Sequence, residues 1–193
     1  MSAQPALGVT PTQTVGPFHA PALLRDVQNI LTTSRTEGQR IRVEGRLLDG
    51  SGAPMDEALV EIWQANSHGR FNHPRDRRDD VPLDPEFGGF GRSGTDEEGR
   101  WAILTLKPGP VPGASGEAAQ APHVDLNIFA RGLLHRVVTR LYFADEGQSN
   151  AADPVLAGLD EDARATLVAQ PCADGYELDV HLQGPHETTF FAV

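Results

Sequence analysis

The sequence contains very little cysteine. Cys172 is the only cysteine among 193 residues, so the chain can form neither an internal disulfide nor a zinc site built on several thiolates. Positive charge is also scarce, because 16 Lys and Arg stand against 27 Asp and Glu, which gives a net charge of −11. The one basic cluster lies in residues 75–80, where arginines and aspartates mix as in a solvated loop. We therefore expect no nucleic-acid partner, since phosphate contacts need a clustered positive face.

Long apolar stretches are missing as well. No segment approaches the roughly 20 apolar residues that a membrane-spanning helix needs. The first residues, MSAQPALG, also lack the charged and then apolar pattern of a signal peptide. We therefore expect a cytoplasmic protein with no membrane partner.

Aromatic residues make up only 6% of the chain, whereas 20 Gly and 15 Pro favour many short elements joined by turns. Apolar residues alternate in Arg40–Leu48, and Ala121–Phe143 has the pattern of two paired strands. Several short strands with turns between them predict a mainly β fold, a β-sandwich. One short helix is predicted near residues 160–169, ending before Pro171.

The N-terminal segment differs from this pattern. TPTQTVGPF, Thr10 to Phe18, has neither helical nor strand periodicity, and its Thr, Gly and Pro favour an extended, irregular path. We therefore predict an arm over residues 1–38 and a β-sandwich core over residues 39–193.

One pair of side chains suggests metal chemistry. His123 and Asp125 are two residues apart, so both point to the same face of a strand. An H-x-D pair is the first half of a two-histidine, one-carboxylate iron(II) triad, and His181 is the candidate third ligand. Residues 182–193 contain no Arg or Lys to hold a cosubstrate carboxylate, which weakens the interpretation of the chain as an iron(II) oxygenase.

Four sequence blocks, in their order, resemble the intradiol ring-cleavage dioxygenases. That family holds a non-haem iron(III) with two tyrosines and two histidines. Aligned on its motifs, the tyrosine positions are Phe71 and Val111, the first histidine is His123 and the second is Asp125. Neither Phe nor Val offers an oxygen ligand to iron(III), so the resemblance implies a chain that kept the frame and lost the iron site. The blocks are GRFNHP (Gly69 to Pro74), LDPEFGGFGRSGTDEEG (Leu83 to Gly99), LKPGPVPG (Leu106 to Gly113) and Ala121 to Phe143.

The resemblance also implies a partner. In one branch of the family, which cleaves the carboxylated catechol protocatechuate with O2, an α subunit without iron pairs with a β subunit that holds Fe(III). This chain resembles that α subunit, so the resemblance implies an α-β hetero-oligomer, with no cofactor bound by this chain and with an arm that packs on the partner. An alternative is a β-sandwich binding module with no enzymatic partner, because fold alone does not decide function.

Five substrate-binding residues follow from the same resemblance. Arg131, in the sequence IFARG, matches an arginine near the pocket shared with the β subunit, where it would hold the substrate carboxylate. Thr14, Gly16, Pro17 and Phe18 match an arm motif that reaches into the partner's pocket. The plainer alternatives are a solvated arginine at a strand end and a mobile chain terminus.

Overall fold

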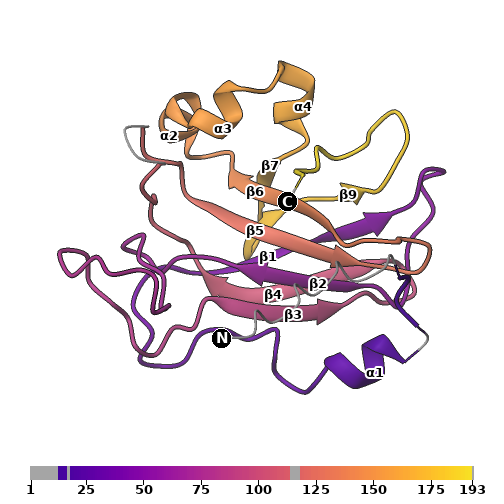
Figure 1. Cartoon of the computed structure of the whole chain (residues 1–193), viewed down its shortest axis with the longest axis horizontal. Coiled ribbons are helices and arrows are strands. Elements are labelled where there is room, and N and C mark those ends of the chain that lie inside the picture. The colour runs from indigo at the N-terminus through magenta and orange to yellow at the C-terminus, as the bar shows by residue number, and fades with distance from the viewer. Residues whose placement is uncertain (1–12, 17, 114–117, 193) are drawn as a thin grey trace, which may run out of the picture.

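The computed structural model describes residues 13–16, 18–113 and 118–192 (Figure 1). Within them, nine strands form a sheet of order β3-β2-β5-β6-β7-β8-β1-β4, and β9 pairs with β1. The strands are β1 (Arg40–Leu48), β2 (Leu59–Trp63), β3 (Phe90–Gly94), β4 (Arg100–Leu106), β5 (His123–Phe129), β6 (Val137–Phe143), β7 (Val168–Cys172), β8 (Gly175–Glu177) and β9 (Val180–His181). The helices are short: α1 (His19–Leu23), α2 (Gly147–Ala152), α3 (Pro154–Ala157) and α4 (Glu161–Ala165).

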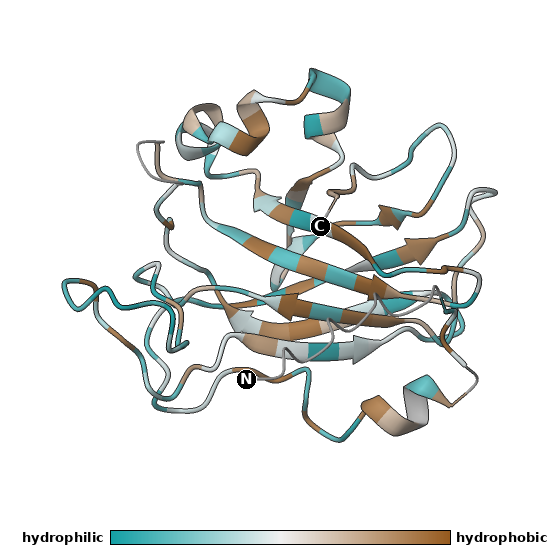
Figure 2. Ribbon diagram, in the orientation of Figure 1, coloured by the Kyte–Doolittle hydropathy of each residue, from teal (hydrophilic) through white to brown (hydrophobic). Residues whose placement is uncertain are grey.

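The strands fold into two packed layers. One layer holds β3, β2, β5 and β6, the other holds β4, β1, β8 and β9, and β7 passes between them. Val168 and Ala169 pair with β6, whereas Gln170 to Cys172 pair with β8. Apolar side chains of both layers form one buried core, and Figure 2 shows the apolar and polar residues alternating along the strands. The predicted β-sandwich is confirmed.

The predicted strand faces are correct. Ile41, Val43 and Leu47 of β1 are buried in the core, as their alternation indicates. Gly45, on the same face, is approached so closely by the chain that a Cβ there would lie 1.8 Å from the Leu178 carbonyl oxygen. The predicted strand pair is β5 and β6, joined as antiparallel neighbours.

The predicted helix is too long. Helix α4 spans only Glu161–Ala165, and the Asp160 side chain caps it by accepting a hydrogen bond from Ala163 N at 2.8 Å. Val168 and Ala169, predicted as helical, instead continue the sheet because they pair with the end of β6. Pro171 therefore lies inside strand β7 and not beyond a helix.

The last part of the predicted arm belongs to the sandwich edge. Gln28 O accepts a hydrogen bond from Arg92 N of β3 at 3.0 Å, and Asn29 O accepts one from Leu104 N of β4 at 2.8 Å. Leu31 N donates to Leu104 O at 2.8 Å, so this segment lies between the two edge strands. It thus covers backbone groups that an open edge would expose. The boundary between residues 1–38 and 39–193 stays a prediction.

Among the described residues, the structure has no helix long and apolar enough to cross a membrane.

Candidate functional site

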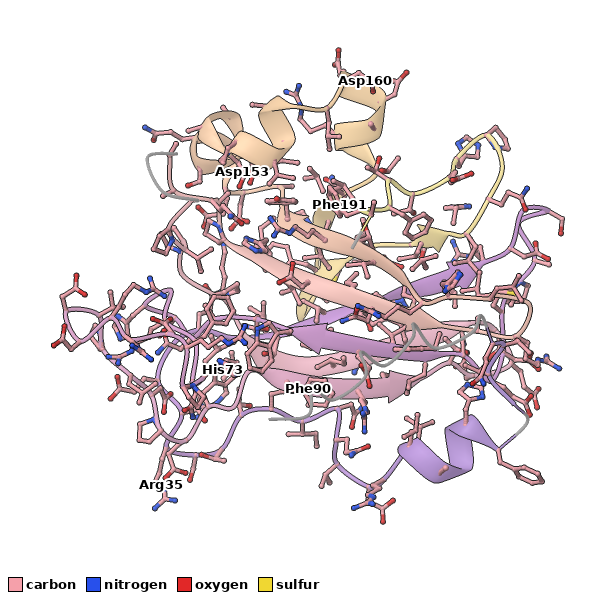
Figure 3. All side chains as sticks on the ribbon, viewed as in Figure 1. Arg35, His73, Phe90, Asp153, Asp160 and Phe191 are labelled. Atoms are coloured by element: carbon pink, nitrogen blue, oxygen red, sulfur yellow. The ribbon has the colours of Figure 1, made fainter. Side chains whose placement is uncertain are left out.

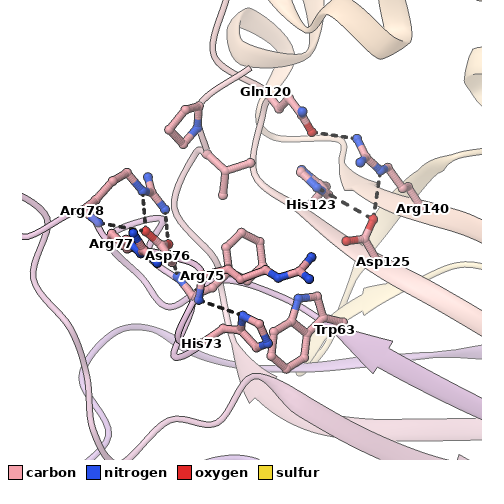
Figure 4. Close-up of a pocket in the computed structure, with 13 residues that line it drawn as sticks. Trp63, His73, Arg75, Asp76, Arg77, Arg78, Gln120, His123, Asp125 and Arg140 are labelled. Atoms are coloured by element: carbon pink, nitrogen blue, oxygen red, sulfur yellow. Dashed lines mark hydrogen bonds and ion pairs between the residues drawn. The ribbon is translucent and has the colours of Figure 1, made fainter. Parts of the chain in front are cut away.

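A pocket of about 880 Å³ lies beside β2 and the start of β5 (Figure 4). It brings together the four positions that correspond to iron ligands in the family motifs: Phe71, Val111, His123 and Asp125. These residues come from three separate segments, namely the loop after β2, the loop after β4 and strand β5 itself. The frame of a metal site is therefore present in this chain.

Two loops must touch to place Phe71 beside Val111. Asn66 O accepts hydrogen bonds from Gly69 N at 3.0 Å and from Gly109 N at 2.9 Å, which ties the loops together. Gly69 has φ +81°, and a Cβ there would lie 1.9 Å from the carbonyl oxygen of Pro110. Only glycine fits both the left-handed backbone and this close approach.

Beyond this junction, Phe71 stacks on Trp63 of β2, with ring centroids 5.8 Å apart and planes at 8°. The first tyrosine position of the family motif is thus occupied by an apolar ring that rests on the sheet. Val111, at the second position, pairs with Gln120, whose N donates to the Val111 carbonyl oxygen at 2.8 Å.

The charged part of the pocket comes from β5 and β6. Asp125 and Arg140 are directly paired across the two strands, and Arg140 Nε donates to Asp125 Oδ1 at 2.9 Å. Arg140 Nη1 also donates to Gln120 Oε1 at 2.8 Å. The partly buried carboxylate of Asp125 therefore has a cationic partner, as its removal from water requires.

His123 is buried on the same face of β5. A short contact of 2.7 Å joins its Nδ1 to the Ala121 carbonyl oxygen, so Nδ1 carries the proton and donates it. Burial, and then the nearby Arg140 guanidinium, lower the pKa of His123. Nε2 of the neutral ring lies 3.9 Å from Asp125 Oδ1.

These residues do not fit an iron(III) ion of the intradiol type. Phe71 and Val111 have no donor atom, and Asp125 is already bound by Arg140, which leaves the Nε2 atom of His123. Among the described residues, no group of three or more His, Cys, Asp or Glu side chains is placed to hold a metal ion. We assign no metal-dependent step to this pocket.

The iron(II) triad predicted as an alternative is wrong. His181 lies in β9, paired with Leu48 of β1 in the layer opposite to β5, and its ring contacts His186 at 5.8 Å. It does not line the pocket that contains His123 and Asp125. The sequence could not place His181, because the pairing of β9 with β1, a contact distant in the chain, decides which layer it joins.

Neither tyrosine of the chain replaces the lost ligands. Tyr142 is buried next to the pocket, where its hydroxyl lies 3.3 Å from Arg140 Nη1 and donates to Asp153 Oδ1 at 3.4 Å. Burial raises the pKa of Tyr142 to about 12. Tyr176 lies elsewhere and donates to Asp145 Oδ2 at 2.8 Å.

Sequence reasoning missed three arginines of the site. Arg75, Arg77 and Arg78, which the sequence suggested were part of a solvated loop, line the pocket together with Arg140 (Figure 4). Asp76 fixes their loop by accepting from Phe71 N at 2.9 Å and from Arg78 Nε at 2.8 Å. Their place in the sequence could have indicated this role, because these arginines directly follow the block that contains Phe71.

Arg131 lies away from this pocket. It lies just beyond the end of β5, after Ala130, whereas His123 begins that strand, so the whole length of β5 separates them. The Arg131 side chain is 57% exposed, and its Nη2 donates to Asp56 Oδ1 at 2.6 Å. Glu57, whose carboxylate lies 3.8 Å from Arg131 Nε, has an unusual φ of +52°.

Two described residues near the start of the arm lie beside the connection that contains Arg131. Gln13 and Val15 line a hollow together with residues 129–130 and 133–136 of the β5–β6 connection. Thr14 and Gly16 are exposed, and the ring of Phe18 is 77% exposed. Pro17 lies outside the described residues. Gln13 and Val15, which flank Thr14, thus lie beside the connection that contains Arg131, at the end of β5 away from His123.

Comparison with known proteins identifies the family. A family model described as Dioxygenase matches residues 16–183. The protocatechuate 3,4-dioxygenase alpha chain of Burkholderia cepacia is 38% identical over 95% of this chain and 97% of its own length. The beta chain of the same organism is 39% identical over 83% of this chain and 72% of its own length.

The fold is shared with solved dioxygenases. The dioxygenase domain of a carbohydrate-binding fusion protein from Streptomyces sp. SirexAA-E superposes with a TM-score of 0.60 at 22% identity, covering 91% of this chain and 99% of that domain. The long matches in sequence and the common fold agree with the ligand positions gathered in one pocket. The chain belongs to the intradiol ring-cleavage dioxygenase family.

Proposed function

We propose that this chain is the α subunit of a protocatechuate 3,4-dioxygenase and that it binds no iron itself. A partner β subunit would hold Fe(III). The assembled enzyme would open the ring of 3,4-dihydroxybenzoate between its two hydroxyl groups, with O2, to give 3-carboxy-cis,cis-muconate. One observation carries the proposal: a chain 38% identical to such an alpha chain gathers the four ligand positions in one pocket, with Phe71, Val111 and an Arg140-bound Asp125 among them.

The similarity to both kinds of chain supports a paired enzyme. This chain is about as similar to the Burkholderia cepacia beta chain, at 39%, as to the alpha chain, at 38%. Two chains of one fold can form a pseudo-symmetric pair in which only one keeps its metal ligands. The retained frame then serves the interface, and the partner supplies the complete ligand set.

Within this pair we propose that Arg131, Thr14, Gly16, Pro17 and Phe18 wall the substrate pocket of the partner. Phe18 is an exposed aromatic side chain, of the kind that partner proteins cover. The Arg131 guanidinium has five N–H donors, so it can keep its bond to Asp56 and still present donors to a substrate carboxylate.

Co-expression tests the assignment. The chain is produced alone and with a β chain that keeps both tyrosines and both histidines, and iron content and protocatechuate-dependent O2 uptake are measured. We expect iron and activity only in the co-expressed complex, with both chains in equal amounts. Stoichiometric iron in the chain alone, or full activity of the β chain without it, would refute the proposal.

The role of Arg131 has its own test in the complex. Arg131→Ala should raise the KM for protocatechuate by about 10–100-fold, the worth of a charge-assisted hydrogen bond, with a smaller effect on kcat. Arg35→Ala is the matched control, because Arg35 is also an exposed arginine in an ion pair, with Glu86 at 2.9 Å, and projects from the margin of the molecule (Figure 3). Equal KM values for the two variants would remove Arg131 from the substrate site.

A further inference from the structure

The pocket at the lost iron site is a basic hollow in an acidic protein. Four arginines and two aspartates line it, so with neutral histidines its charge is about +2, against −11 for the whole chain. The arginines are Arg75, Arg77, Arg78 and Arg140, and the aspartates are Asp76 and Asp125. Such a local reversal of sign concentrates anions at the pocket.

Two of the arginines are available for a ligand. Arg78 is bonded to Asp76, and Arg140 is bonded to Asp125, so both of these cations are neutralised within the pocket. Among the described residues, the guanidinium groups of Arg75 and Arg77 have no hydrogen-bond or ion-pair partner. Both side chains are exposed on the rim, where they can reach a bound molecule.

The floor and one wall of the pocket are apolar. Trp63 and Phe71 stack on each other, and the His73 ring meets Trp63 edge-on at 6.2 Å. Val111 and Pro112 continue the apolar surface on the other loop. The apolar residues at the two tyrosine positions of the family motif, Phe71 and Val111, thus form part of a surface suited to a flat ring.

We propose that this pocket binds a small aromatic carboxylate, with its ring against Trp63 and Phe71 and its carboxylate held by Arg75 and Arg77. Each part of the ligand matches a part of the pocket. An arginine fork recognises a carboxylate through paired hydrogen bonds, and the aromatic wall removes the ring from water. The site would be separate from the pocket proposed around Arg131, and it does not depend on the identity of the reaction.

Three probes separate the contributions of charge and ring. Benzoate has both, benzamide keeps the ring without the charge, and acetate keeps the carboxylate without the ring. Binding is followed on the full chain by calorimetry and by the fluorescence of Trp63, the tryptophan that lines the pocket, whereas Trp101 is buried in the core. We expect saturable binding of one benzoate per chain, with benzamide and acetate each at least about tenfold weaker.

A double variant assigns the binding to this pocket. Arg75→Ala with Arg77→Ala should weaken benzoate binding at least about tenfold. Arg35→Ala with Arg100→Ala is the matched control, since it removes two exposed arginines outside the pocket and changes the net charge equally. All four arginines are exposed, so circular dichroism is expected to show an unchanged fold in both variants.

The benzoate affinities of the two double variants can also be compared in a complex with a β chain. There, the difference between the two affinities measures binding at this pocket alone. Equal affinity for benzoate and acetate, no saturation below about 10 mM, or equal losses in the two double variants would each overturn the proposal.

Discussion

Replacing Arg140 tests whether its guanidinium stabilises the fold by neutralising Asp125, which stands at a ligand position of the family motif. Arg140→Met keeps the apolar stem of the side chain and removes the guanidinium. The variant loses the charged bond to Asp125 at 2.9 Å, the bond to Gln120 at 2.8 Å and a longer contact with Tyr142 at 3.3 Å. Asp125 then remains partly buried without a cationic partner.

The expected decrease in the free energy of unfolding lies between two known limits. Breaking a fully buried ion pair costs about 3–5 kcal/mol, whereas an exposed pair is worth about 0–1 kcal/mol. The Arg140 and Asp125 side chains are 21% and 28% exposed, so neither limit applies directly. We expect the free energy of unfolding to fall by about 2 kcal/mol in Arg140→Met.

A double-mutant cycle assigns that loss to the pair. Asp125→Asn keeps the shape of the side chain and removes its charge, so the double variant has no unpaired carboxylate. Urea unfolding of the four proteins should give a coupling free energy of about 1 kcal/mol or more between positions 125 and 140. Additive effects, with a coupling below about 0.3 kcal/mol, would show that Arg140 stabilises the fold by packing and not by neutralising Asp125.

Three further outcomes follow from single contacts. Asp153→Ala should lower the free energy of unfolding by about 3 kcal/mol, because this buried carboxylate accepts from three backbone N–H groups, and Asp153→Asn should cost less. In Tyr176→Phe, which leaves Tyr142 as the only tyrosine, the ultraviolet signal of tyrosinate should appear with a midpoint of about 12. Since that pKa is above the unfolded value of about 10, stability is complete below pH 10 and is lost as pH rises toward 12; a midpoint near 10 would contradict the burial of Tyr142. Gly69→Ala should cost about 2 kcal/mol more than Gly52→Ala, because both glycines have φ +81° and only Gly69 faces a carbonyl oxygen at 1.9 Å.

Much of the fold could be predicted from alternation of apolar residues. The faces of β1 and the pairing of β5 with β6 follow from patterns of period two, which tertiary packing reinforces. The segment at Val168 was misassigned because its pattern is too short to separate helix from strand. Its pairing with β6, a contact distant in sequence, decides the outcome.

The site was partly predictable for a similar reason. The resemblance to the family motifs pointed to Phe71, Val111, His123 and Asp125, and the structure brings all four into one pocket. The ion-pair partner of Asp125 could not be predicted, because Arg140 lies beside Asp125 only through the register in which β5 and β6 pair. The rim arginines were missed because a loop rich in both charges has the composition of a solvated surface, whichever way it points.

A single substitution at one of these ligand positions would not build the iron site of the family. Phe71→Tyr alone would add one oxygen ligand, but Val111 would still offer none, and the donor set would stay incomplete. Asp125→His would remove the partner of Arg140 and leave that guanidinium in the pocket, where its positive charge would oppose the binding of a cation. Phe71→Tyr alone therefore leaves the donor set incomplete, and Asp125→His alone also costs stability, because it leaves Arg140 without its acidic partner. In this structure the Trp63–Phe71 stack and the Asp125–Arg140 pair hold four of the pocket's side chains in contacts that involve no metal.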